Sequence, residues 1–110
     1  MKVKVVQCHP GDGAFPTFSK GTAVKITGEE CAEFGHWFPC KIDGYATYIP
    51  EIYLADGILI RDYNPTELVQ GVGDILDVKE IVNAWLYAAN ENGTKGWIPA
   101  EAVVSRSINF

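Results

Sequence analysis

Hydrophobic and polar positions alternate over short stretches of this chain, and turn residues separate the stretches. The alternation is clearest in Val24-Lys25-Ile26 and in Leu76-Asp77-Val78. A period of two places successive side chains on opposite faces of a strand, so both segments predict strands. Residues 22–30 come nearest to a helical stripe, but their β-branched side chains and Gly28 favour a strand that ends in a loop. The pattern predicts an all-β protein.

The same order of segments occurs in both halves of the chain. Each half has a glycine three residues before its alternating strand, then a segment led by tryptophan, a turn, and an aromatic-Ile-Pro ending. The matching parts are Gly21 and Gly73, segments 37–42 and 85–90, turns 43–44 and 90–93, and endings 48–50 and 97–99. Asp-Gly at 43–44 is typical of a two-residue hairpin turn. This order predicts an internal duplication.

The period of the repeat is near half the chain. It therefore predicts two similar units rather than a solenoid, which needs at least three shorter repeats. We place the boundary at Ala55-Asp56-Gly57, which gives domains at 1–55 and 56–110. Barrels of about 55–65 residues can fold alone. The linker is so short that the two units are expected to pack closely.

Residues 58–104 resemble the SH3 domain family. The family's motifs are echoed, in order, by Leu-Ile-Arg-Asp-Tyr at 59–63, Glu67-Leu68, Gly73-Asp74, Trp85, and the run Gly93, Gly96 and Pro99. The first half keeps Phe18, Gly21, Val24, Ile26, Trp37, Gly44, Pro50 and Tyr53 in the same order, with Val6 and Cys8 in place of the opening tyrosines. The resemblance implies two SH3-like small β-barrels in tandem, as in bacterial proteins of this type.

The resemblance also implies a site and a partner. SH3 domains bind extended, proline-rich peptides in a shallow aromatic groove, because a polyproline II strand loses little entropy on docking. The implied groove residues are Tyr63, Trp85 and Pro99 in the second half, with Asp62 and Glu67 for a basic ligand side chain, and Trp37, Pro50 and Tyr53 in the first half. Arg61 and Ala102 stand where the family has tyrosines. We therefore expect weak or atypical peptide binding.

The charge balance narrows the class of partner. Nine Lys and Arg against fourteen Asp and Glu give a net charge of −5, most of it in the second half. An acidic surface repels phosphate backbones, so a basic peptide is a better partner than nucleic acid. No apolar run approaches the ~18 residues of a membrane span. The first residues also lack a signal-peptide pattern, so we expect a cytoplasmic protein.

Reactive side chains are few. Cys8, Cys31 and Cys40, with His9 and His36, lack the close paired spacing of a zinc site. An odd set of cysteines without such pairs suits a reducing compartment. No helix N-terminus is expected beside Cys40 to activate its thiol, and no phosphate-binding glycine loop occurs. We expect no metal, no cofactor and no enzyme activity.

Three functions from different classes remain open. The first is an adaptor that binds a protein or an extended peptide. The second is a cell-wall-binding module of the bacterial SH3 type, which the missing export signal disfavours. The third is a structural or homo-oligomerising protein whose aromatic faces are buried by packing.

Overall fold

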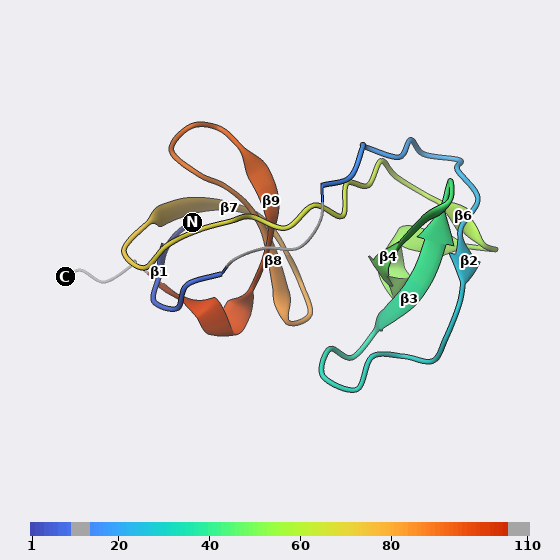
Figure 1. The fold of residues 1–110 in the computed structure, drawn as a ribbon, viewed down its shortest axis with the longest axis horizontal. Coiled ribbons are helices and arrows are strands. Elements are labelled where there is room, and N and C mark those ends of the chain that lie inside the picture. The colour runs from blue at the N-terminus through green and yellow to red at the C-terminus, as the bar shows by residue number, and fades with distance from the viewer. Residues whose placement is uncertain (10–13, 106–110) are drawn as a thin grey trace. The chain divides into compact units, whose positions relative to one another are not determined.

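The computed structural model describes residues 1–9 and 14–105 (Figure 1). Its elements are, in chain order, β1 (Lys2–Val5), β2 (Lys25–Ile26), β3 (Trp37–Ile42), β4 (Tyr45–Pro50), the 3₁₀ helix η1 (Glu51–Tyr53), β5 (Leu54–Ala55), β6 (Ile58–Leu59), β7 (Ile75–Val82), β8 (Trp85–Ala89), β9 (Lys95–Pro99), the 3₁₀ helix η2 (Ala100–Ala102) and β10 (Val103–Ser105). The named strands all pair antiparallel. The predicted all-β class is confirmed.

The chain forms two compact units, and one of them is discontinuous in sequence. The first unit is made of Met1–Ala14 and Thr66–Phe110, and the second is Phe15–Pro65. We call them the split unit and the inserted unit. This division differs from the expected domains at 1–55 and 56–110. The reason is that β1, at the start of the chain, pairs with β7 on one side and with β10 on the other.

The expected linker at Ala55-Asp56-Gly57 is a hairpin turn. Asp56 and Gly57 have φ values of 53° and 75°, and they join β5 to β6. Positive φ at both central residues is the geometry of a type I′ turn, which Asp-Gly adopts readily. The composition that suggested a boundary is therefore explained by a tight turn inside the inserted unit.

The split unit is built on an open five-stranded sheet with the order β10-β1-β7-β8-β9. β1 alternates exposed lysines with buried valines, so that Val3 and Val5 join the core. That core consists of Val3, Val5, Leu68, Leu76, Leu86, Ala88, Ile98 and Ala102, with Val78 and Val103 packed against it. Burial of the two valines, at roughly 1.5–3 kcal/mol each, explains why the first strand belongs to this sheet.

The inserted unit contains two smaller open sheets, β2-β3-β4 and β5-β6. Isolated bridges between Phe18 and Tyr63 and between Ala23 and Ile58 connect its first and last segments. Asp43 and Gly44 have φ values of 49° and 83°, so the predicted two-residue turn between β3 and β4 is confirmed. Cys40, Ile42 and Ile49 are almost fully buried on one face of the larger sheet.

The predicted repeat appears as a shared order of elements in the two units. In each, a strand begins with tryptophan, its hairpin partner ends in proline, and a 3₁₀ helix and a short strand follow. The register is also shared, because Trp37 lies opposite Pro50 and Trp85 lies opposite Pro99. Among the described residues, the sheets are open, so a closed barrel is not what they form. Neither 3₁₀ helix of the described residues has the length or apolarity of a membrane-crossing helix.

Candidate peptide-binding site

Trp85 and Pro99 lie together where the β8–β9 pair of the split unit's sheet ends. Trp85 begins β8 and Pro99 ends β9, and the two residues face each other in the register. Pro99 has a φ of −67°, which its ring fixes, and its nitrogen has no hydrogen to donate. The 3₁₀ helix η2 follows it directly. The Ala100 amide donates to the Ala84 carbonyl at 2.8 Å, which ties the helix to the turn before Trp85. The backbone on both sides of Trp85 is therefore paired, and its indole is half-buried.

Glu67 is positioned by a short segment that lies beside β9. The Leu68 amide donates to the Trp97 carbonyl at 2.8 Å, and the Trp97 amide donates to the Thr66 carbonyl at 3.0 Å. Gly96 permits this approach, because a Cβ there would lie 2.9 Å from the Leu68 nitrogen. These bonds cover the outer edge of β9, an edge that would otherwise be open to pairing.

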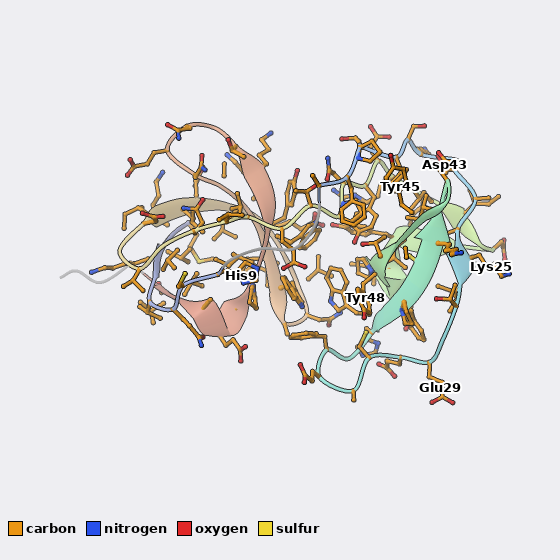
Figure 2. The ribbon with its side chains drawn as sticks, viewed as in Figure 1. His9, Lys25, Glu29, Asp43, Tyr45 and Tyr48 are labelled. Atoms are coloured by element: carbon orange, nitrogen blue, oxygen red, sulfur yellow. The ribbon has the colours of Figure 1, made fainter. Side chains whose placement is uncertain are left out.

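His9 connects Glu67 to Trp85. Its backbone pairs with Gln70, with N···O distances of 2.9 and 3.0 Å. Its Nε2 lies 2.8 Å from Glu67 Oε1, and the side chains of His9 and Glu67 are 15% and 25% exposed. The imidazole meets the Trp85 ring edge-on, with centroids 6.0 Å apart. We call His9, Glu67, Trp85 and Pro99 the Trp85 cluster; Figure 2 labels His9 in the segment that follows β1.

A polar network around the buried Gln70 supports the cluster. Gln70 is buried, its Nε2 donates to Asp74 Oδ2 at 2.7 Å, and its Oε1 accepts from Asn90 Nδ2 at 3.1 Å. Asn90 Oδ1 in turn accepts from the amides of Asn92 and Thr94 in the β8–β9 turn. Buried polar groups that are satisfied in this way fix a single arrangement of the chain. The network therefore holds the segment around Gln70 against the hairpin that carries Trp85.

The chemistry of the Trp85 cluster suits a cation on an extended chain. A partly exposed indole attracts Lys or Arg through its ring face. A carboxylate beside it can accept a charge-assisted hydrogen bond from the same side chain. Pro99, opposite Trp85, is buried and packs at the end of β9. The cluster thus offers stacking and one negative charge rather than a reactive atom.

The remaining expected site residues lie in the inserted unit and are mostly buried. Trp37, Tyr53 and Tyr63 are 6%, 2% and 3% exposed, and Pro50 is also buried. The rings of Tyr53 and Tyr63 meet edge-on with centroids 5.4 Å apart. The Tyr63 hydroxyl donates to the Tyr48 carbonyl. In this unit the expected groove residues form packing contacts.

Asp62 of the expected groove, and Arg61 in place of a family tyrosine, also have structural contacts in the inserted unit. Asp62 Oδ1 accepts the Lys20 amide at 2.8 Å, which fastens the turn at 19–22. The Arg61 guanidinium lies 4.4 Å from the centroid of the Tyr53 ring. Of the eight expected residues, Trp85, Pro99 and Glu67 belong to the split unit, whereas Tyr63, Asp62, Trp37, Pro50 and Tyr53 belong to the inserted unit.

Sequence reasoning missed the role of His9. It considered this histidine only as a metal ligand or as a base for a cysteine nucleophile, and its partner Glu67 is 58 positions away. No local pattern marks such a pair. The two residues meet because the segments before and after the inserted unit in the sequence pair with each other. Among the described residues, no group of three or more His, Cys, Asp or Glu is placed to hold a metal ion.

The cysteine thiols are shielded to different degrees. Burial raises the pKa of Cys40 to about 11, and Cys40 is almost inaccessible to solvent. The pKa of Cys31 is also raised, first by burial and then by the nearby charge of Glu30. Cys8 is exposed. A thiol with a raised pKa is a poor nucleophile at neutral pH, because the thiolate is the reactive form.

No protein-family model, curated protein or solved structure matches this chain. The fold and the site define the class: an all-β protein in which a tryptophan strand, a proline-ended partner strand and a 3₁₀ helix occur twice. The tryptophan of the more exposed pair, Trp85, shares His9 as a neighbour with the carboxylate of Glu67.

Proposed function

We propose that this chain is a non-enzymatic binding protein built of two SH3-like units, and that the Trp85 cluster binds an extended, basic peptide. One observation carries the proposal: Glu67 and the indole of Trp85 are both in contact with His9, at the end of the sheet where Trp85 faces Pro99. A half-buried indole and a carboxylate that share His9 as a neighbour match the apolar ridge and cationic side chain of such a peptide.

The binding is expected to be weak. Ala102 offers no ring where the equivalent position of the inserted unit has Tyr53. His9 also occupies one oxygen of Glu67. An exposed ion pair adds only about 0.2–1 kcal/mol, so the carboxylate orients the peptide more than it holds it. A cytoplasmic location belongs to the same proposal, supported by three free cysteines.

A titration of the whole protein tests the proposal. The probe is an acetylated, amidated peptide of repeating Pro-Leu-Pro with one terminal arginine, followed through the indole N–H signals of the three tryptophans. We expect saturable shifts at Trp85 and weaker binding in Trp85→Phe. Glu67→Gln should lower the affinity for the arginine peptide by about 1.4- to 5-fold. It should leave the affinity for a peptide with glutamine in place of arginine unchanged.

The matched control is Glu101→Gln, which removes one exposed carboxylate from the same unit without touching the cluster. It should bind the arginine peptide as the natural protein does. Shifts confined to Trp37, or equal effects of Glu67→Gln and Glu101→Gln, contradict the assignment to Trp85.

A structural role is the second candidate for the inserted unit. The burial of Trp37, Tyr53 and Tyr63 favours it, since rings that are packed against protein cannot stack on a peptide. In that case the inserted unit contributes stability rather than a second peptide groove. Substitution of Tyr63 by Phe should then lower stability, through the lost hydrogen bond to Tyr48, without changing peptide affinity.

A further inference from the structure

The outer face of the β2-β3-β4 sheet carries two lysines directly opposite each other. Lys25 of β2 is the register partner of Lys41 of β3, so their side chains project from the same face. Cys40 and Ile42, the neighbours of Lys41, are buried on the other face. Both lysines are exposed. The sheet therefore presents a pair of like charges to solvent.

This pair is unfavourable for the sheet itself. Like charges directly opposite on neighbouring strands destabilise the pairing. Neither lysine forms an ion pair or a side-chain hydrogen bond with any residue of the described part of the chain. Figure 2 shows Glu29 and Asp43, which lie beyond the strand ends, well apart from Lys25. No described residue therefore forms an ion pair with either lysine.

An exposed aromatic ring lies on the same face. Tyr48 of β4 is paired in register with Pro39, two residues from Lys41 on β3, and Ala46 faces Lys41 directly. The alternation along β3 and β4 places these side chains on the side of Lys41. Tyr48 is 55% exposed, and Figure 2 shows it on the β4 side of the sheet, with Lys25 on the β2 side. We call Lys25, Pro39, Lys41, Ala46 and Tyr48 the lysine face.

We propose that the lysine face binds an acidic, extended peptide segment of a partner protein. Two adjacent ammonium groups attract carboxylates, and the small side chain of Ala46 leaves the sheet surface open between Lys41 and Tyr48. The phenol ring and Pro39 provide apolar contact for the chain between its acidic residues. This surface is separate from the Trp85 cluster and prefers the opposite charge.

Charge complementarity favours a peptide over nucleic acid. The inserted unit has four basic residues and seven acidic ones, a net charge of −3. Phosphate backbones are bound by many basic contacts at once, and the described residues of the lysine face supply only two lysines. A short acidic segment needs only the local pair.

Amide NMR titrations of the whole protein at low salt test the proposal. The probe is an acetylated, amidated peptide of alternating Glu and Pro, compared with its Gln-Pro analogue and with oligothymidylate. We expect saturable shifts at Lys25, Lys41 and Tyr48 with the acidic peptide only. Replacing both lysines by Gln should weaken binding by about 2- to 25-fold, whereas Lys20→Gln, which removes an exposed charge elsewhere in the unit, should leave it unchanged.

A second variant keeps the proposal testable through stability. Lys25→Glu converts the like-charge pair into an opposite-charge pair with Lys41. It should raise the folding equilibrium constant by about 1.4- to 5-fold and abolish binding of the acidic peptide. The proposal is overturned by equal binding of the Gln-Pro peptide, by tighter binding of oligothymidylate, by an absence of shifts, or by an equal loss in Lys20→Gln.

Discussion

Substitution of Gly96 by alanine tests the arrangement that positions Glu67. A Cβ at this position would lie 2.9 Å from the Leu68 nitrogen, 3.0 Å from Leu68 Cγ and 3.0 Å from the Thr66 carbonyl oxygen. Two of these three atoms belong to the backbone, so no side-chain rotation relieves the contact. The segment 66–68 must move away from β9.

The cost can be worked out from the bonds that this movement strains. Overpacking of this kind destabilises by about 1–3 kcal/mol. The bonds from Leu68 to Trp97 and from Trp97 to Thr66 are 2.8 and 3.0 Å long, and losing one adds roughly 1 kcal/mol. The reduced freedom of alanine in the unfolded chain offsets about 0.4–1 kcal/mol. We expect a net loss of about 1–3 kcal/mol, or about 4–8 °C in Tm for each kcal/mol in a domain of this size.

Urea denaturation and amide hydrogen exchange measure the effect. Gly96→Ala should lower the unfolding midpoint and speed exchange at the amides of Leu68 and Trp97. The control is Gly71→Ala in the same unit, where the nearest atom would be 4.0 Å from the new Cβ and stability should hold or rise slightly. Equal stability of the two variants, with unchanged protection at Leu68, would refute the proposed packing of this segment.

Three further predictions concern the division of the chain and its thiols. Val5→Ala removes buried methyl groups from β1 and should destabilise the protein by about 1.5–3 kcal/mol. Hydrogen exchange should show the loss of protection in residues 66–105 and not in 15–65. The reverse pattern would contradict the pairing of β1 with β7 and β10. Burial raises the pKa of Cys40 to about 11 from 9.0, so between these pH values the folded protein keeps a proton that the unfolded chain releases. The free energy of unfolding, measured in urea, should therefore fall between pH 9 and about 11. The fall should be larger in the natural protein than in Cys40→Ala. A disulfide reagent at neutral pH should modify Cys8 rapidly and Cys40 only on unfolding.

Local signals in the sequence predicted the parts of the fold that depend on neighbouring residues. The tryptophan-led strand at 37–42 and the Asp43-Gly44 turn are found where expected, because strand alternation and turn chemistry act over a few positions. The expected domain boundary was placed at Asp56-Gly57, which is a hairpin turn, because a hairpin turn and a linker share the same composition.

The candidate site could be predicted only in part, because long-range pairing decides which residues meet. Trp85 and Pro99 were expected from the repeat and do face each other. His9 reaches Glu67 only because β1 and the segment after it join the second half of the chain. Nothing in the residues around His9 marks that partner.

The discontinuity of the split unit has a consequence for the order of events during synthesis. Strand β1 is translated before the inserted unit, whereas its partners β7 and β10 are translated after it. The contiguous inserted unit can form as soon as residue 65 is free, as domains do when they fold in the order of translation. β1 therefore has no partner until the inserted unit has been made, and a nascent chain halted before residue 75 would carry a folded inserted unit flanked by unpaired segments.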